Sequence, residues 1–266
     1  MEKESMSGFS TNPPIHQPPT HHGTIWSSGG GVQSAAIAAL IVNGDLPHLD
    51  LAAISDTERE ASATWVYHNT VIAPALTAVG VTLQRVYKST YATVDLYSNN
   101  GTLLIPVHTS TGKFPTYCST EWKRRVIRWW ARAVRLDIKT WVVWLGISID
   151  EPRRVKPTDT PWLTRYPLIE HQMSRADCVK LIASMGWPSA PRSSCWMCPN
   201  HTIQEWNRLQ QEAPEDFAAA IRFENTIREQ DDEIWLTRTH RPLSEWVGDG
   251  PPDLFTGLCD SGYCFI

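Results

Sequence analysis

The amino-acid sequence predicts an α/β fold, in which a Rossmann-like parallel sheet has helices on both faces and a small Cys-containing region follows at the C-terminus. Strand-like and helix-like segments alternate through most of the chain, and such alternation is typical of parallel sheets because their crossovers are helical. The first strand-like segment leads directly into three glycines, at the position where open α/β sheets bind ligands. From Pro188 onward, proline- and cysteine-containing loops surround two helix-like segments, so we expect a separate small region there.

Three regions are expected along the chain. Residues 1–23 carry several prolines and histidines and predict a flexible tail. Residues 24–187 predict the sheet domain, and residues 188–266 predict a mostly helical, Cys-containing region packed on it. The expected strands are Gly23–Ser28, Asp50–Ser55, Val81–Tyr87 and Thr140–Ile147. The expected helices are Val32–Asn43, Ala61–Ala78, Thr120–Leu136, Ser174–Met185 (with a capping-box-like start), Ile203–Gln211 and Glu215–Gln230.

The composition is that of a globular protein, because 42% of the 266 residues are hydrophobic and 20% are charged. The net charge of −4 gives no general attraction to nucleic acid, so any such contact needs a local basic patch. The longest apolar run, residues 35–42, is far shorter than the about 20 residues of a membrane span, and no secretory signal pattern is present. We expect a cytoplasmic protein with no membrane contact, whose six cysteines are thiols or metal ligands.

The segment after the first strand is suited to anion binding. It is Ser28-Gly29-Gly30-Gly31-Val32-Gln33-Ser34, and an apolar helix-like run follows it. Glycines let backbone N–H groups approach an anion closely, and a helix N-terminus adds a partial positive charge. Neither the dinucleotide fingerprint GxGxxG nor the Walker A pattern is present. The alternative to a phosphate or sulfate site is a glycine-rich turn without a ligand.

This segment resembles the PP-loop, SGGxDS, of the ATP pyrophosphatases, in the variant of the phosphoadenosine phosphosulfate (PAPS) reductase-like family. Glycine replaces the first serine, and Gln33 replaces the aspartate. The resemblance implies an adenine nucleotide alpha hydrolase-like fold, with residues 24–187 as its PP-loop nucleotide-binding domain. It also implies that the chain binds ATP or PAPS through Ser28, Gly29, Gly30, Gly31, Gln33 and Ser34.

Two further elements match this family. Asp56 and Thr57 follow the second strand and match an Asp-Thr pair that contacts the adenosine, although Asp56 also suits a helix cap. The stretch from Cys118 to Lys123 resembles the Cys-Thr-x-x-x-Lys element, with a threonine in place of the arginine that often precedes the cysteine. Lys123 supplies a compact positive charge toward a phosphate or sulfate.

The segment after the fourth expected strand resembles the family's Gly-Ile-x-x-Asp-Glu-x-x-Arg element. Its adjacent Arg153 and Arg154 suit bidentate binding of an oxyanion. Asp150 and Glu151 would orient these arginines or hold Mg²⁺ through water.

Arginines recur on one face of the helix that begins near Thr120. Their spacing is that of neighbours on a helix surface, and they are Arg124, Arg128, Arg132 and Arg135. The face is either solvated or a contact for a polyanion such as nucleic acid.

The cysteines form the clearest second signal. Cys195 and Cys198 form a CxxC followed by proline, which suits zinc, an iron–sulfur cluster or a redox dithiol. In those relatives within the family that modify DNA or RNA with sulfur, such a pair and the cysteine of the Cys-Thr element bind a 4Fe-4S cluster. The resemblance therefore implies Cys118, Cys195 and Cys198 as cluster ligands, with Cys259 or Cys264 as a fourth or an open iron site, and zinc as the alternative metal. Cys178 is expected to be a buried thiol.

The set of motifs predicts an enzyme that binds an adenine nucleotide for sulfur-related chemistry. The leading reaction is adenylation of an acceptor, with nucleic acid as one candidate, followed by sulfur transfer from a donor protein, with Lys123, Arg153 and Arg154 as catalytic residues. The Glu-Cys-Gly-x-His segment of true PAPS reductases is missing, so reduction of an adenylyl sulfate through Cys259 or Cys264 is the first alternative. A non-catalytic, zinc-stabilised module that binds nucleic acid is the second alternative. The oligomeric state is not predicted.

Overall fold

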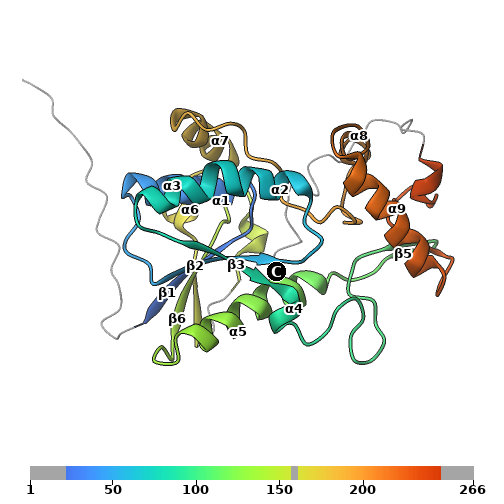
Figure 1. Cartoon of the computed structure of the whole chain (residues 1–266), viewed down its shortest axis with the longest axis horizontal. Coiled ribbons are helices and arrows are strands. Elements are labelled where there is room, and N and C mark those ends of the chain that lie inside the picture. The colour runs from blue at the N-terminus through green and yellow to red at the C-terminus, as the bar shows by residue number, and fades with distance from the viewer. Residues whose placement is uncertain (1–21, 157–160, 247–266) are drawn as a thin grey trace, which may run out of the picture.

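The computed structural model describes residues 22–156 and 161–246. Its centre is a five-stranded sheet in the order β3-β2-β1-β6-β7, and every pairing in it is parallel (Figure 1). The strands are β1 (Gly23–Ser28), β2 (Leu51–Asp56), β3 (Leu83–Tyr87), β6 (Trp141–Leu145) and β7 (Trp162–Arg165). The α/β fold class predicted from the sequence is confirmed by this topology. Nearly all of the expected tail, as well as Cys259 and Cys264, lies outside the described residues.

Helices cover both faces of the sheet (Figure 1). On one face, α1 (Val32–Asn43) packs against α7 (Arg175–Ser184) and α3 (Ala73–Ala78), and their apolar side chains share one core with β2 and β6. On the other face, α5 (Arg125–Val134) buries Val126, Ile127 and Trp130 in a second core. Among the described residues, no helix combines the length and the apolarity that a membrane span requires.

The predicted helices form with small differences at their ends. The segment Ala61–Ala78 is α2 (Ser62–Tyr67), a π-helical turn at His68–Ile72, and α3, and a second π-helical turn, Thr120–Arg124, leads into α5. The capping box at Ser174 is present, because its hydroxyl accepts from the Asp177 N–H and the Asp177 carboxylate accepts from the Ser174 N–H. The remaining short helices are α4 (Lys88–Tyr91), α6 (Pro167–Glu170), and 3₁₀ turns at Pro152–Arg154 and Leu243–Glu245.

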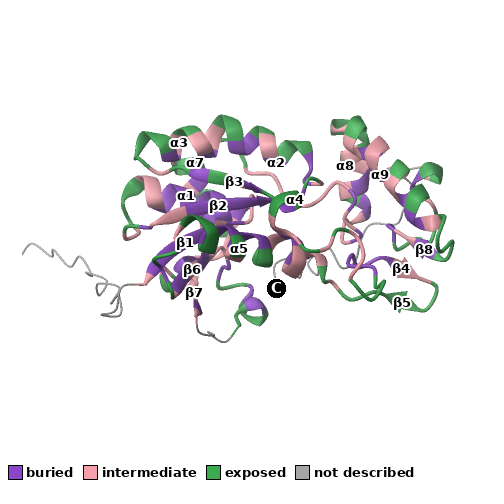
Figure 2. Cartoon of the chain, turned by 60° about the horizontal axis from the view of Figure 1, so that its bottom comes forward, coloured by how far each residue is buried: buried purple, intermediate pink, exposed green. Residues whose placement is uncertain are grey.

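A smaller lobe packs beside the sheet domain (Figure 2). It contains α8 (Ile203–Glu212), α9 (Pro214–Arg228) and a three-stranded sheet in the order β5-β4-β8. These strands are β4 (His108–Thr109), β5 (Gly112–Lys113) and β8 (Ile234–Trp235). The core of the lobe joins Trp206 and Phe217 from its helices to a segment, Leu103–Val107, that precedes α5. The C-terminal region is thus not built alone but around this earlier segment.

Candidate functional site

A cavity of about 450 Å³ opens at the carboxyl edge of the sheet, where β1 leads into the glycine loop. This volume lies within the range that small-molecule sites occupy. The glycine loop, the end of β6, one side of α5 and the segment before the CxxC all contribute to its wall. The residues of the predicted phosphate loop that line it are Ser28, Gly29, Gly31, Gln33 and Ser34.

The glycine loop is held in shape by its own serines. The Ser34 hydroxyl accepts from the Gly29 N–H at 2.7 Å, and the Ser28 hydroxyl accepts from the Gly30 N–H at 3.3 Å. Gly30 has φ +78°, a conformation that favours glycine. A Cβ at Gly30 would also lie 2.9 Å from the Thr64 methyl group. Gly30 therefore determines the shape of the loop, but it does not line the cavity. The N–H groups in the first turn of a helix are the groups that bind anions. In α1, no side chain caps this end of the helix.

The charge of the cavity wall is strongly positive. Seven cationic side chains line it, and Glu151 is the single carboxylate among its described lining residues. The cations are Lys123, Arg124, Arg128, Arg154, Lys156, Arg175 and Arg192. This excess in a chain of net charge −4 creates a local field that favours an anion with several charges.

Glu151 organises one end of this wall. Its Oε1 accepts from Arg154 Nη1 at 2.7 Å, and its Oε2 accepts from the Gln33 amide at 3.2 Å. Arg175 Nη1 in turn donates to the Gln33 carbonyl oxygen at 3.3 Å. Gln33 therefore connects the glycine loop to two arginines of the wall.

The carboxylates expected to hold Mg²⁺ have other partners. Asp150 accepts from the Arg175 N–H at 2.8 Å and 3.1 Å through its two oxygens, and Glu151 uses both of its oxygens for Arg154 and Gln33. Mg²⁺ requires carboxylate or other oxygen ligands in octahedral geometry. These two side chains do not fit a magnesium site in this arrangement.

Of the two predicted adjacent arginines, only one belongs to the cavity. Arg154 is 8% exposed and lines the wall, whereas Arg153 is exposed and does not. Because a 3₁₀ turn has three residues per turn, the adjacent side chains of Pro152–Arg154 point in directions about 120° apart, and one arginine turns inward while its neighbour turns outward. Lys123 also lines the cavity, as predicted, and its Nζ lies 2.6 Å from Glu60 Oε1.

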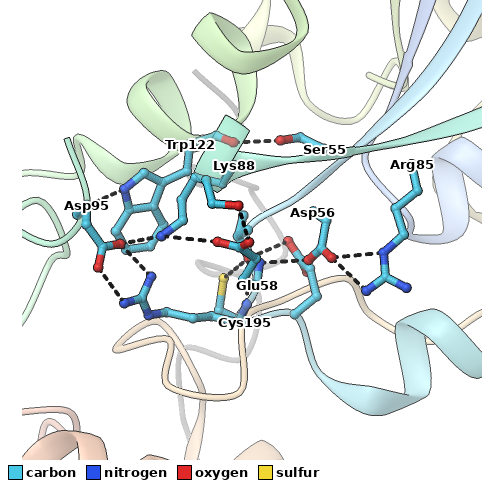
Figure 3. Close-up of polar contacts among 12 residues, drawn as sticks. Ser55, Asp56, Glu58, Arg85, Lys88, Asp95, Trp122 and Cys195 are labelled. Carbon is cyan, nitrogen blue, oxygen red and sulfur yellow. Dashed lines mark hydrogen bonds and ion pairs between the residues drawn. The ribbon is translucent and has the colours of Figure 1, made fainter. Parts of the chain in front are cut away.

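Glu60 connects the cavity wall to the CxxC segment. Thr57 Oγ1 donates to Glu60 at 3.4 Å and lies 3.3 Å from the Cys195 sulfur. Glu60 and Cys195 form an isolated antiparallel bridge, and the Ala61 N–H donates to Ser194 at 2.9 Å. Figure 3 shows Cys195 beside this turn after β2. The chain thus places the CxxC next to Lys123, although the two lie far apart in sequence.

The turn after β2 is braced by two ion pairs that share the Asp95 carboxylate (Figure 3). The Arg59 guanidinium donates to Asp95 at 2.8 Å, and the buried Lys88 ammonium pairs with the same carboxylate. These partners lower the pKa of Asp95 to about 2, the hydrogen bond from Arg59 being the main cause. Trp122 completes the set by donating its indole N–H to the Asp95 carbonyl oxygen.

Asp56 does not line the cavity. It is 1% exposed, and its Oδ2 accepts from Arg85 at 2.8 Å and 2.6 Å. The Arg85 guanidinium lies 3.7 Å from the centre of the Trp65 ring. Asp56 and Thr57 therefore have partners within the protein at the place where the sequence predicts adenosine contacts, and a role in nucleotide binding stays a prediction.

The cysteines are partly brought together. Cys118, Cys195 and Met197 belong to or pack against the core of the smaller lobe, and Cys195 and Cys198 are joined by a turn with a 3.1 Å N–H···O bond. Burial and the Glu60 charge raise the pKa of the Cys195 thiol, and burial raises the pKa of Cys178 to about 12. In the part of the chain that the structure describes, no three His, Cys, Asp or Glu side chains are spaced as ligands of one metal. The thiol set is of the right chemistry for zinc or a 4Fe-4S cluster, and because Cys259 and Cys264 lie outside the described residues, the metal site stays a prediction.

Several residues of the cavity wall have no counterpart in the sequence motifs. They are Lys156, Trp162, Arg175 and Arg192. Arg175 is the first residue of α7, directly after the capping serine, and Arg192 precedes the CxxC by only a few residues. A lone arginine in a loop gives no pattern to detect, because the fold alone brings it to the site.

Comparisons with known proteins give structural likeness only. No protein-family model and no curated protein matches the chain. It is similar to two enzymes of known structure. One is phosphoadenylyl-sulfate (PAPS) reductase from Candida auris in a phosphate complex, with TM-score 0.41, 13% identity, and coverage of 66% of this chain and 83% of that one. The other is the U34-tRNA thiolase NcsA from Methanococcus maripaludis with its 4Fe-4S cluster, with TM-score 0.41, 13% identity, and coverage of 78% and 72%.

Proposed function

We propose that the chain is an enzyme that binds the phosphate groups of an adenine nucleotide in the cavity at the glycine loop and uses the nucleotide in sulfur-related chemistry. The observation that carries this proposal is the wall itself, in which seven cations and one carboxylate surround a serine- and glycine-rich loop. Backbone N–H groups, hydroxyls and arginines are the donors that bind phosphate oxygens, and arginine does so bidentately. The motifs that resemble the PAPS reductase-like family favour adenine as the base.

The reaction that we favour is adenylation of an acceptor. An acceptor oxygen attacks the α-phosphorus of ATP, the bond between the α-phosphorus and its bridging oxygen breaks, and pyrophosphate leaves. We assign to Lys123 and Arg154, which line the cavity, the neutralisation of the charge that grows on the departing phosphates. A sulfur nucleophile from a donor protein then displaces AMP from the activated acceptor, for which nucleic acid is our candidate.

We rank adenylation above reduction of an adenylyl sulfate because of the surroundings of the Cys195 thiol. Reduction requires a reactive thiolate near the nucleotide, and the Cys195 thiol lies beside Thr57, which hydrogen-bonds to Glu60, the partner of Lys123. Burial raises the pKa of this thiol, so the nucleophilic thiolate is disfavoured there.

The proposal is tested by nucleotide titration and by pyrophosphate release. Calorimetric titration of the wild-type chain should show binding of ATP, and pyrophosphate should appear when RNA or DNA acceptors are added with ATP. Binding of PAPS with release of sulfite on addition of a dithiol would replace adenylation by reduction. Absence of binding for every adenine nucleotide would overturn the proposal.

A further inference from the structure

The cavity extends well below the glycine loop, along the face of the sheet that α5 covers. Its lining includes Leu145 at the end of β6 and also Val143, which lies two residues earlier on the same face. Two residues of a strand span about 7 Å. Because Leu145 is in register with Ser27 and Val143 with Ile25, the cavity reaches to the middle of the strands, beyond the space that a phosphate group at the loop requires.

This deeper part, which we call the α5 slot, has a mainly apolar lining. It is bounded by Ile127 and Arg128 of α5, Val143 of β6, and Trp162 and Thr164 of β7. Trp162 is buried and stacks on Trp141 with ring centres 5.9 Å apart, and the Arg128 guanidinium lies 5.1 Å from the centre of the Trp162 ring. The Arg132 guanidinium lies 5.4 Å from the same ring, so Trp162 is covered by these partners and holds Arg128 in place at the slot. An apolar slot beside a planar cation has the chemistry that receives a flat, aromatic group.

One polar group of the slot is open. The Thr164 hydroxyl makes no hydrogen bond within the described residues, although the side chain is only half exposed and lines the cavity. It therefore offers one donor and one acceptor to a ligand. By contrast, the carboxylate at the end of β2, Asp56, is buried and bonded to Arg85.

We infer that the α5 slot binds the base of the nucleotide, with Thr164 as its hydrogen-bonding partner. This inference rests on the proposed function, since the phosphates must occupy the glycine loop for the base to reach the slot. It differs from the expectation of the sequence motifs, which place the adenosine at Asp56 and Thr57 after β2. The ligand class is a nucleotide with a flat heteroaromatic base, and the specificity-determining residues are Thr164 and Arg128.

The experiment compares inorganic pyrophosphate with ATP by calorimetric titration. Pyrophosphate occupies only the phosphate site, so its affinity reports the proposed function, and the extra affinity of ATP reports the slot. The test variant is Thr164→Phe, which fills the slot from an edge strand. The matched control is Leu163→Phe, which adds a ring to the opposite face of the same strand, where Leu163 packs with the α1 core. Thr164→Val, which removes only the hydroxyl, is a second variant that perturbs packing little.

In the wild-type chain we expect ATP to bind at least about tenfold more tightly than pyrophosphate, a difference of about 1.4 kcal/mol. Thr164→Phe should reduce the affinity for ATP to that for pyrophosphate and leave pyrophosphate binding within about twofold, and Thr164→Val should weaken ATP binding alone. Leu163→Phe should retain the preference for ATP. If the wild type binds both ligands equally, or if both Thr164 variants retain full ATP affinity, the α5 slot is not the base site. Failure of pyrophosphate itself to bind would instead refute the phosphate site.

Discussion

Replacing Arg154 by alanine is the sharpest perturbation of the phosphate site. The side chain is 8% exposed, lines the cavity and is fixed by a 2.7 Å hydrogen bond to Glu151. A hydrogen bond to a charged group contributes about 1.5–3 kcal/mol, so Arg154→Ala should weaken pyrophosphate binding by about 10- to 150-fold. Calorimetric titration measures this loss directly. The substitution also leaves the Glu151 carboxylate buried beside Gln33, so thermal unfolding of each variant must be recorded in parallel.

The neighbouring arginine provides the matched control. Arg153 is exposed and does not line the cavity, so Arg153→Ala should change the affinity for pyrophosphate by less than about twofold, as surface charges at a distance are screened by salt. Equal losses in the two variants would show that the long-range charge, and not the position of Arg154, determines binding. No loss in Arg154→Ala, with the fold intact, would remove this residue from the site.

Three further predictions concern the loop, the pH dependence and the cysteines. Gly30→Ala should reduce the free energy of unfolding by about 1–2 kcal/mol because φ is +78° at this position. Gly31 has an extended conformation, so Gly31→Ala should reduce it less. Equal values for the two variants in denaturant unfolding would contradict the loop geometry. Burial, with a smaller effect of the Lys113 charge, lowers the pKa of His108 to about 4, below the about 6.5 of an unfolded chain. The contribution of His108 to stability is therefore present above pH about 6.5 and lost as the pH falls toward 4. Unfolding curves of His108→Gln should depend less on pH in this window, and an unchanged dependence would assign the effect to other groups. The resemblance predicts that the anaerobically purified protein contains iron or zinc, and that the Cys178→Ser variant retains this metal. Metal analysis that finds neither metal in the wild type would refute the prediction. The variants expected to lose the metal are Cys118→Ser, Cys195→Ser and Cys198→Ser.

Much of the fold was predictable because its signals are local. The strand Gly23–Ser28 and the helix Val32–Asn43 begin and end where the sequence predicts, since a run of β-prone residues, three glycines and a closing Gly44 mark the boundaries. The capping box at Ser174 was visible for the same reason. The strand β7 was missed because it is only four residues long and lies at the sheet edge, where alternation is too brief to detect.

The candidate site was predictable only in part. The serines and glycines of the loop, Lys123 and Arg154 were found because they form short motifs, and the structure brings them to one cavity. Asp56 was expected in the site but is bonded to Arg85, a partner on the next strand that no local pattern reveals. Trp162 and Thr164 could not be predicted, because their place in the cavity depends on how α5 lies over β6 and β7.

The measurement that tests the central claim most directly is a crystal structure of the chain with a non-hydrolysable ATP analogue. The account predicts phosphate oxygens within hydrogen-bonding distance of the backbone N–H groups of the Ser28–Ser34 loop and of the Arg154 guanidinium, with the base in the α5 slot. The account would be contradicted by a nucleotide that binds elsewhere on the surface and leaves the glycine loop and the seven cations of the cavity wall without a ligand.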